Sequence, residues 1–399
     1  MNHAILYITY DGVLEPLGQS QVLRYLERLA PDHKFVLISY EKPDDWQQAE
    51  RRGALLKHIR EAGIIFIPLR YHKRPTALAT AFDIAQGVVV GAWAVMRHRV
   101  RIVHARSYVP SVIALVLKKL FRLRYIFDMR GFWADERVDG GLWRRDGRMY
   151  RAAKWFERRF LLAADHVVSL THAAVREMKR FDYLQKRMPS FTVIPTCADL
   201  ARFKPLARER TGAAFVLGYV GSAGTWYLFD ETVACFVLLL RMRPDARFLI
   251  LNRGEHDYIR ERLSVAGVPT TSVELTTASH ADVPRQMARM DAGVFLYKPA
   301  FSRHATAPTR LAEFLGCGIP CLGNTGVGDM AEVLEGEQVG VALKSFDEAA
   351  LNHGLNQLLA LVADPTTAGR CIAAAQRHFS LDDGVTKYAA VYKQLAANS

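Results

Sequence analysis

The sequence predicts an α/β protein of two doubly wound domains, and three observations carry that prediction. The chain of 399 residues is longer than one ordinary hydrophobic core, so two domains of roughly 150 to 200 residues are expected. Short apolar runs alternate with helix-like segments, and this alternation restarts after about residue 212. The runs are continuously apolar, which is typical of parallel strands buried on both faces. We therefore expect two parallel sheets facing each other across a cleft, with ligands at the carboxyl ends of the strands.

The expected strands follow from these runs in chain order. In the first half they are 4–9, 35–40, 64–69, 101–106, 125–129, 166–171 and 191–196. In the second half they are 213–221, 247–252, 272–277, 292–297, 319–323 and 339–343. The segment 199–212 is polar, basic and Pro-containing, which indicates a linker between domains 1–205 and 206–379. A last helix is expected because apolar residues recur at helical spacing at Val385, Tyr388, Val391, Tyr392 and Leu395.

The net charge of +13 predicts a polyanionic partner, such as an anionic membrane face, nucleic acid or a phosphorylated substrate. No helix-turn-helix, RNA-recognition or zinc-finger pattern supports nucleic acid. Arg and Lys cluster with apolar and aromatic residues in four segments of the first half, 97–101, 118–124, 144–159 and 179–187. That composition predicts a protein surface that binds acidic lipid headgroups. The alternative, that these segments are helix faces exposed to water, explains the composition equally well.

The cysteines and apolar stretches indicate the compartment. Five cysteines without regular spacing or a CxxC pair fit a reducing, intracellular environment. The N-terminal MNHAILYITYDG lacks the basic and long apolar regions of a signal peptide. The longest apolar stretches, 84–96 and 109–117, fall short of the roughly 20 residues of a spanning helix. We therefore expect a cytoplasmic protein, soluble or peripheral on the inner face of the cell membrane.

The first expected strand leads into the loop and helix start YDGVLEPLGQSQVLRYLERLA (10–30). A Gly-containing turn at a helix N-terminus offers free backbone N–H groups, here around Gly18 and Gln19. The turn is neither a P-loop nor a GxGxxG motif, so an ordinary β–α connection is the simpler interpretation.

Charged residues also end two further strands of the first half. His104 and Arg106 end one, and Asp128 and Arg130 follow the next. A carboxylate at the end of a buried strand is costly unless it is paired or used. Asp128 is therefore a candidate general base for a hydroxyl, with His104 and Arg106 beside it. The alternative is a structural ion pair between Asp128 and Arg130.

The second half opens with the glycine-rich stretch LGYVGSAGTWYLFDETV (217–233). Gly218, Gly221 and Gly224 are spaced by three residues, after a strand and before a helix. That context favours phosphate contact at Ser222, Ala223 and Gly224. The full dinucleotide fingerprint is absent, and tight packing of the strand against the helix is the alternative.

A single carboxylate stands in the stretch APTRLAEFLGCGIPCLGNTGVGD (307–329). Pro308 suits the first turn of a helix, on which Arg310 and Glu313 share a face. Such a pair can hold a nucleotide, the cation by its diphosphate and the carboxylate by two ribose hydroxyls. The alternative is an exposed i,i+3 salt bridge, which the apolar surroundings disfavour.

Together these motifs resemble the GT-B glycosyltransferases of family 4, retaining enzymes that build bacterial polysaccharides and glycolipids. The resemblance covers nearly the whole chain and is carried by residues 10–30, 193–205, 218–227 and 308–329. It implies a UDP- or GDP-linked sugar donor on the second domain and a glycan or lipid-linked acceptor on the first. It also implies that helix 380–399 crosses back to the first domain.

The resemblance implies that Glu313 holds the donor ribose as the second glutamate of the family's paired motif. The first glutamate would fall at position 305, which is Ala. The family's Arg/Lys pair after the first strand of the second domain is missing, so Arg253 and Arg310 are expected to supply its charge, with Arg303 as a further candidate. Asp128 replaces the histidine that these enzymes often carry after a first-domain strand.

In the front-face route proposed for this family, the leaving diphosphate takes the acceptor proton, so no protein nucleophile is required. No DxD, HExxH or Cys/His ligand spacing is present, and we expect no cofactor and no metal. The expected catalytic residues are Asp128, Arg130 and His104, and the expected acceptor residues are Gly18, Gln19 and Arg106. The expected donor residues are Glu313, Arg310, Thr309, Arg253, Gly221, Ser222, Ala223 and Gly224.

Two other classes of function stay open from the sequence. The first is a GT-B-fold nucleotide-sugar epimerase or phosphorylase, although no clear cofactor lysine for a phosphorylase is present. The second is a non-catalytic basic protein that binds a membrane surface. Turnover of a nucleotide sugar without an acceptor would favour the epimerase, and salt-sensitive vesicle binding without nucleotide binding would favour the membrane protein.

Overall fold

The computed structural model describes residues 4–207, 214–279 and 281–397, and it divides into two compact units. The first unit is Met1–Pro195 with Leu381–Ser399, and the second is Thr196–Ser380. The division falls ten residues before the expected boundary at 205. The backbone explains the difference, because Ala198 donates its N–H to the Phe379 carbonyl at 3.0 Å and Phe203 packs in the core of the second unit. Residues 208–213 of the expected linker lie outside the described residues.

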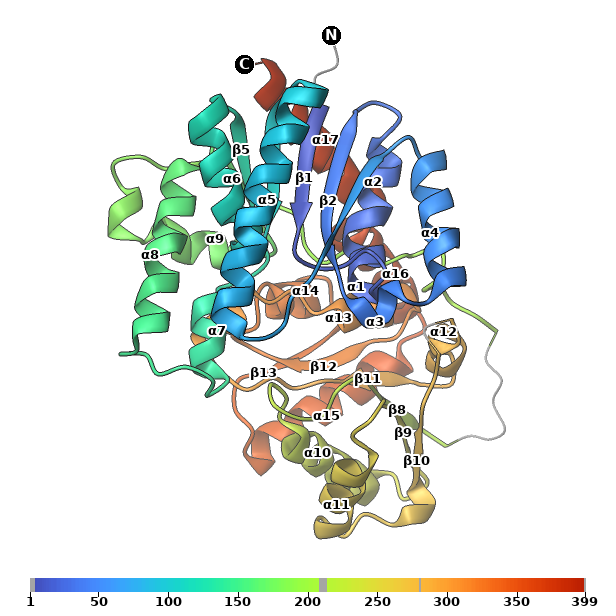
Figure 1. Cartoon of the computed structure of the whole chain (residues 1–399). Coiled ribbons are helices and arrows are strands. Elements are labelled where there is room, and N and C mark those ends of the chain that lie inside the picture. Colours follow the sequence, from blue (N-terminus) through green and yellow to red (C-terminus); the bar gives the residue numbers. More distant parts are fainter. Residues whose placement is uncertain (1–3, 208–213, 280, 398–399) are drawn as a thin grey trace. The chain divides into compact units, whose positions relative to one another are not determined.

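The first unit is built on a seven-stranded parallel sheet with the order β3-β2-β1-β4-β5-β6-β7 (Figure 1). Its strands are β1 (Ala4–Thr9), β2 (Phe35–Glu41), β3 (Ile65–Arg70), β4 (Val100–Arg106), β5 (Arg124–Met129), β6 (His166–Ser169) and β7 (Ser190–Val193). The central strands β1, β2 and β5 are almost wholly buried, which accounts for their continuous apolar runs. The order reverses direction between β1 and β4, and ligands of doubly wound sheets bind at such a reversal.

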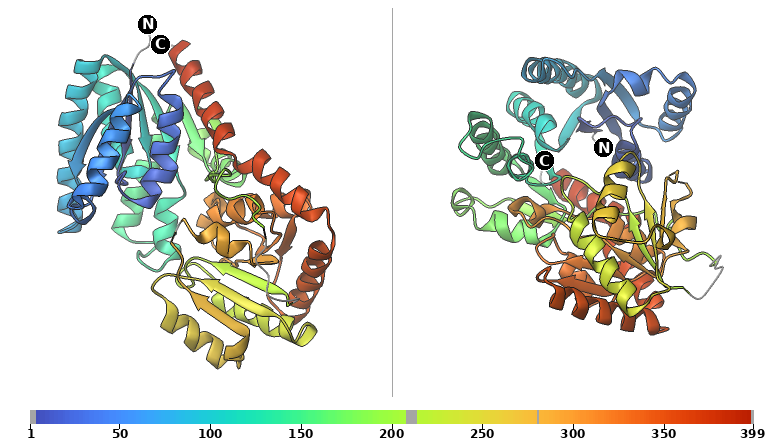
Figure 2. Two further views of the ribbon diagram at one scale, coloured as in Figure 1. Left: turned by 90° about the vertical axis from the view of Figure 1, so that its right-hand side faces the viewer. Right: turned by 90° about the horizontal axis from the view of Figure 1, so that it is seen from below.

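Helices cover both faces of this sheet. They are α1 (Pro16–Gly18), η1 (Gln19–Leu23, a π-helix), α2 (Arg24–Leu29), α3 (Pro43–Trp46), α4 (Ala49–Glu61), α5 (Thr76–His98), α6 (Tyr108–Phe121), α7 (Trp133–Asp139), α8 (Arg148–Ala163), α9 (His172–Lys179), η2 (Asp182–Leu184, a 3-10 turn) and α17 (Leu381–Ala397). Helices α5, α6 and α8 pack side by side on one face, and α2 and α17 lie together on the other (Figure 2). The C-terminal helix α17 therefore belongs to the first unit, which confirms the expected return.

Helix α5 corrects one expectation. The apolar stretch 84–96 continues into a helix of 23 residues, of which Ala77–His98 is long and apolar enough to cross a membrane. A second such span would require the bent helix pair Glu348–Ala363 and Thr367–Phe379, which meet at 99°, to act as one. Length and composition alone are weak evidence for a span, because a core helix meets the same criteria. Helix α5 packs against β1, β2 and β4 of its own unit.

The second unit repeats the architecture with a six-stranded parallel sheet of order β10-β9-β8-β11-β12-β13. Its strands are β8 (Val216–Val220), β9 (Arg247–Leu251), β10 (Val273–Thr276), β11 (Ala292–Val294), β12 (Cys321–Asn324) and β13 (Gly340–Leu343). Every expected strand is present, although most are shorter at one end or both than the apolar runs. Residue 213, where the first of these runs begins, lies outside the described residues.

Two apolar cores fill the two faces of this sheet. Its helices are α10 (Phe229–Met242), α11 (His256–Val265), η3 (Thr270–Ser272), α12 (Val283–Met287), η4 (Phe301–Ala305), α13 (Thr309–Gly316), α14 (Met330–Gly336), α15 (Glu348–Ala363) and α16 (Thr367–Phe379). Helices α10, α11 and α15 supply one core, and α12, α13, α14 and α16 supply the other. Strand β8 serves both, with Leu217 and Tyr219 in one core and Val216 and Val220 against the other.

Candidate active site

Three adjacent strands of the first unit bring its polar residues together. Residue Thr9 of β1 pairs in register with Arg106 of β4, and Arg106 pairs with Asp128 of β5. These positions stand at the carboxyl ends of the strands, at the reversal of the strand order. The fold therefore gathers the charged residues that the sequence places at separate strand ends.

Asp128 is fully buried within a cage of donors. Its Oδ2 accepts a hydrogen bond from Tyr388 Oη at 3.0 Å and lies 3.4 Å from His104 Nε2. Its Oδ1 lies 3.4 Å from Arg130 Nη1. Tyr388 belongs to α17, so the returning helix supplies part of this cage.

This geometry bears on the role of Asp128. Burial alone would raise the pKa of the carboxyl, but Arg130, His104 and Arg106 together hold that pKa below its usual range. A carboxylate that binds a proton weakly, with both oxygens engaged, is poorly suited to accept a proton from a substrate. The contacts favour the structural ion pair that the sequence left as the alternative, and a catalytic role for Asp128 stays a prediction.

His104 is also fully buried, and both of its ring nitrogens have partners. Its Nδ1 lies 2.7 Å from Tyr392 Oη, and burial lowers the pKa of the ring. A neutral imidazole held at both nitrogens orients Asp128 and Tyr392. In this structure His104 and Arg130 both contact Asp128 and hold it in place, and their expected catalytic roles stay predictions.

Arg106 is a candidate contact for an acceptor at the carboxyl ends of the first-unit strands. Its side chain is buried, and its Nε lies 3.3 Å from the half-exposed Asp11. Its Nη1 is 3.9 Å from Asp128 Oδ2 and has no hydrogen-bond partner among the described residues. A buried, unused donor beside an exposed edge is the strongest first-unit signal for a bound acceptor.

The loop after β1 is held by a carboxylate that the sequence did not single out. Glu41, at the end of β2, accepts from the N–H groups of Val13 at 2.9 Å and Leu14 at 3.3 Å. Gly18 packs against the backbone of Gly12, because an added Cβ would come within 2.0 Å of the Gly12 carbonyl oxygen. Gln19 donates through Nε2 to the Leu14 carbonyl at 3.3 Å. Gly18 and Gln19 therefore shape the loop, and their expected contact with an acceptor stays a prediction.

In the second unit, Arg310 of α13 reaches the glycine turn after β8. Its Nη2 donates to the Ser222 carbonyl at 3.1 Å, and its guanidinium lies 4.1 Å from the Tyr227 ring centre. Gly221 permits this approach, since an added Cβ would lie 2.4 Å from Arg310 Nη2 and the residue has φ of +106°. Ser222 of the glycine turn and Arg310 of α13, which are 88 residues apart in the sequence, therefore belong to one site.

Glu313 lies one turn further along α13, half-buried at the same end of the sheet. Within the described part of the chain its carboxylate makes neither a hydrogen bond nor an ion pair, so the alternative of an i,i+3 salt bridge with Arg310 is wrong. Burial raises the pKa of Glu313 to about 7, against the opposing effect of Arg310. A partly buried carboxylate without a partner is costly in the free protein and is available to a ligand with hydroxyl donors.

Glu255 corrects the expected phosphate contacts in the glycine turn. Its carboxylate accepts from the backbone N–H groups of Ala223 and Gly224, both at 2.9 Å, and from Asn252 Nδ2 at 2.8 Å. The N–H groups expected to face a phosphate are therefore occupied by a carboxylate of the protein. Ser222, which is exposed, is the member of the turn still open to a ligand.

The remaining candidates differ in their placement. Arg253 is exposed after β9 and contacts none of the turn residues by hydrogen bond or ion pair, as far as the described residues go. Arg303 is buried, and its guanidinium lies 4.6 Å from the Trp226 ring centre. Thr309 is half-buried at the first position of α13. Of the proposed compensating cations, Arg310 meets the turn directly.

Sequence reasoning missed four residues of these sites, namely Glu41, Glu255, Trp226 and Tyr227. The two aromatic residues stand in the quoted motif GYVGSAGTWY, so their position beside a cation was the available signal. The two acids carry no local pattern. Among the described residues, no three or more His, Cys, Asp or Glu side chains are grouped so that they could hold a metal ion.

Comparisons with known proteins agree with this arrangement. Residues 18–195 match the family of glycosyl transferase 4-like domains. Sucrose-phosphate synthase from Thermosynechococcus elongatus superposes with a TM-score of 0.76 at 14% identity, and a glycosyltransferase from Rickettsia africae with 0.73 at 14%, each over 100% of both chains. HepE from Anabaena, solved with UDP and glucose, has a TM-score of 0.67 at 17% identity over 98% of this chain and 100% of its own. No curated protein sequence matches the chain.

The solved structures establish the GT-B fold, with two doubly wound units and a returning helix. The family match covers residues 18–195, a little under half of the chain, and indicates a glycosyl transferase 4-like domain there. The chain as a whole therefore has the fold of the GT-B glycosyltransferases, and residues 18–195 are similar to the glycosyl transferase 4-like domains.

Proposed function

We propose that the chain transfers a sugar from a UDP- or GDP-linked donor to a glycan or lipid-linked acceptor, with retention of the anomeric configuration. The proposed setting is the synthesis of cell-surface polysaccharide or glycolipid at the inner face of the cell membrane. The donor belongs to the second unit and the acceptor to the first. The reaction uses neither a metal nor a further cofactor.

The observation that carries the donor assignment is the pair formed by Arg310 and Glu313. The guanidinium stands at the glycine turn after β8, where a diphosphate approaches a doubly wound sheet. The unpaired carboxylate, one turn away, suits the two hydroxyl groups of a ribose. The structures of HepE in complex with UDP and with UDP-glucose support a donor of this kind.

The character of the available side chains supports a front-face reaction. Asp128 and Glu255 both have their oxygens engaged by donors within the protein. Neither is free to attack an anomeric carbon. In the proposed reaction the leaving diphosphate accepts the proton of the acceptor hydroxyl, and the chain supplies position and positive charge through Arg310 and Arg106.

Incubation of the protein with UDP- and GDP-linked sugars and a bacterial membrane extract tests the function. We expect release of nucleoside diphosphate that depends on the extract, unchanged by EDTA, with a product whose anomeric configuration by NMR matches the donor. Release of nucleoside diphosphate in the absence of an acceptor would indicate an epimerase or a hydrolase and not a transferase. Inversion would exclude the front-face route, and loss of turnover with EDTA would exclude metal independence.

A further inference from the structure

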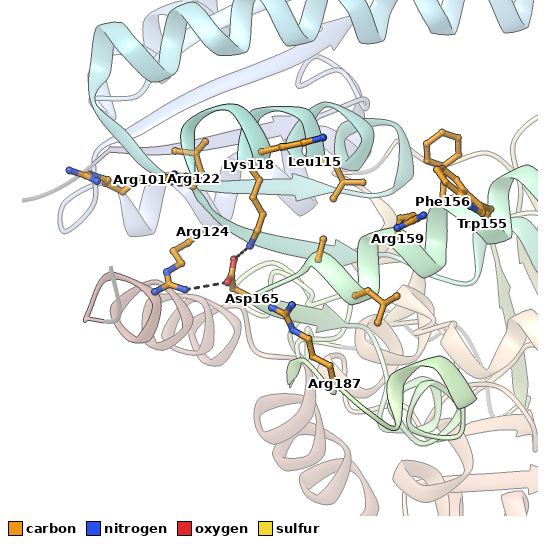
Figure 3. Close-up of a pocket in the computed structure, with 14 residues that line it drawn as sticks. Arg101, Leu115, Lys118, Arg122, Arg124, Trp155, Phe156, Arg159, Asp165 and Arg187 are labelled. Atoms are coloured by element: carbon orange, nitrogen blue, oxygen red, sulfur yellow. Dashed lines mark hydrogen bonds and ion pairs between the residues drawn. The ribbon is translucent and has the colours of Figure 1, made fainter.

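The first unit carries a basic cavity, drawn with its lining residues in Figure 3. Arg101 and Arg124 of its lining stand at the amino ends of β4 and β5, whereas the candidate active site lies at the carboxyl ends of these strands. The cavity measures about 980 Å³ and is lined by seven cations and a single acid, Asp165. Each of the four basic segments of the sequence contributes, for example through Arg101, Lys119, Arg159 and Arg187. The fold therefore collects charges that the sequence could not place on one face.

The one acid of the cavity does not neutralise it. Asp165 is already paired with Lys118 and with Arg124, and it accepts the N–H of Tyr125 at 2.8 Å. In the described part of the chain, the cations Arg101, Lys119, Arg122 and Arg187 have no acidic partner. Like charges converging on one cavity repel each other and create a strong positive potential, which an anionic ligand relieves.

Cations at the end of α6 also complement the helix dipole, which is the simpler explanation for Lys118 and Lys119. That explanation leaves out Arg101 at the start of β4 and Arg187 in the loop after η2. It also leaves out the apolar wall formed by α8, where Arg159 lies 5.0 Å from the Trp155 ring centre and Trp155 itself is 52% exposed. A site for a free anion needs no such exposed aromatic wall.

Helix α5, which packs against α6 of the cavity wall, has an apolar outer face. From Leu78 to Met96 its exposed large residues are apolar, with exposed fractions of 51% to 72%, and they are Leu78, Phe82, Val89, Trp93 and Met96. Between Ala77 and Met96 the only charged residue is Asp83, which is fully buried. A helix that faces water normally carries its charges on the outside, whereas a helix that is apolar all round lies in a core or in lipid. Residues Val116 and Leu120 of the neighbouring α6 extend the apolar surface.

The inner face of α5 is fixed in the first unit, so the helix does not leave to span a membrane. An added Cβ at Gly87 would come within 2.3 Å of Tyr40 Oη, and one at Gly91 within 2.8 Å of Leu117. The buried Asp83 accepts a hydrogen bond from Tyr10 Oη at 2.7 Å. An apolar helix face held at the surface of a folded unit and bordered by cations is the arrangement of interfacial membrane binding.

We propose that α5, α6 and α8 form a docking surface for an anionic bilayer, in which the apolar face of α5 enters the interface and the basic cavity takes a phosphate headgroup. The inference rests on the proposed function, because it names the surface by which the enzyme would reach a membrane. It commits to lipid as the source of the phosphate, because α6, which lines the cavity together with α8, also packs against α5.

Flotation with vesicles of phosphatidylcholine, with and without phosphatidylglycerol, tests the surface. We expect the full chain to bind only the vesicles that contain phosphatidylglycerol. The double variant Lys119→Gln with Arg122→Gln should weaken this binding roughly 30-fold, because it removes the attraction of two cations to the anionic surface. Val89→Ser with Trp93→Ser should weaken it at least about tenfold. The matched controls are Arg60→Gln with Lys344→Gln, and Val265→Ser, at exposed positions elsewhere.

Several results would overturn the inference. They are no binding to anionic vesicles, equal binding by the surface variants and their controls, or saturation of the cavity by inorganic phosphate without vesicle binding. A thermal shift with UDP and GDP on the same preparations separates this failure from failure of the proposed function. If the protein does not bind vesicles but still shows the thermal shift with UDP or GDP, the docking surface is wrong and the proposed glycosyltransferase function is unaffected.

Discussion

The unpaired carboxylate of Glu313 makes nucleotide binding sensitive to pH near neutrality. If the ionised carboxylate accepts from two ribose hydroxyls, affinity follows the fraction of Glu313 that is ionised. With a pKa of about 7, that fraction rises from about one tenth near pH 6 to about nine tenths near pH 8. We therefore expect the affinity of the free protein for its nucleotide to increase about tenfold across this range.

The same carboxylate costs stability in the absence of ligand. A carboxyl whose pKa is raised in the folded state binds more protons when folded than when unfolded, so the free energy of unfolding falls as pH rises from 4.5 to about 7. The shift corresponds to about 1 to 3 kcal/mol once solvent screening of a half-buried group is allowed for. Glu313→Gln should raise the free energy of unfolding by that amount at pH 8 and lower nucleotide affinity by roughly 10- to 100-fold.

Isothermal titration calorimetry at several pH values measures the nucleotide affinity of the wild type and of Glu313→Gln. Urea denaturation of the same two proteins measures their free energy of unfolding. The variant corrects for the titration of the nucleotide's own phosphate, because that contribution is common to both proteins. A wild-type affinity that is constant with pH would refute the reasoning. So would a variant that keeps the wild-type profile.

Three further predictions concern the other buried contacts. Gly221→Ala should lower the free energy of unfolding by about 1 to 2 kcal/mol, because residue 221 has a positive φ. The added Cβ should also displace Arg310, so that calorimetry shows weaker nucleotide binding. An unchanged free energy of unfolding together with unchanged nucleotide affinity would contradict the assigned contact. Glu255→Ala should lower the free energy of unfolding by about 1 to 3 kcal/mol by leaving two N–H groups without their acceptor, and an unaltered urea midpoint would argue against that role. Asp128→Asn should cost about 3 kcal/mol because Arg130 loses its buried counter-ion, with nucleotide affinity retained. Since the pKa of Asp128 is depressed, the wild type should lose this stabilisation as pH falls below about 4, and a variant with full stability would exclude the buried ion pair.

The fold was predictable because its signal is local. All the expected strands are present, since a parallel strand buried on both faces is a continuous apolar run that no amphipathic helix imitates. The last helix was predicted by the helical spacing of residues that include Tyr388 and Tyr392, and its return to the first domain by the family resemblance. The structure places these two tyrosines beside Asp128 and His104. The boundary was less accurate, because Ala198 joins the second unit through a contact with Phe379 that no local pattern records.

The site was predictable in part. Arg310 and the glycine turn were recognised separately, and the absence of a Cβ at Gly221 explains why they meet. The expected phosphate contacts at Ala223 and Gly224 were wrong for the free protein, because Glu255 comes from a third segment, GEHDY, without any motif. The exposed apolar face of α5 was missed for a related reason, since a sequence does not show which side of an apolar helix faces the sheet.

A thermal-shift titration of the purified protein with UDP, GDP, ADP and CMP, for the wild type beside Glu313→Ala, tests the central claim most directly. A ligand that binds only the folded state raises the melting temperature with occupancy. We predict a shift with UDP or GDP that is lost in the variant. No shift with any of the four nucleotides, or an equal shift in the variant, would contradict the assignment of the second unit and of Glu313 to the donor.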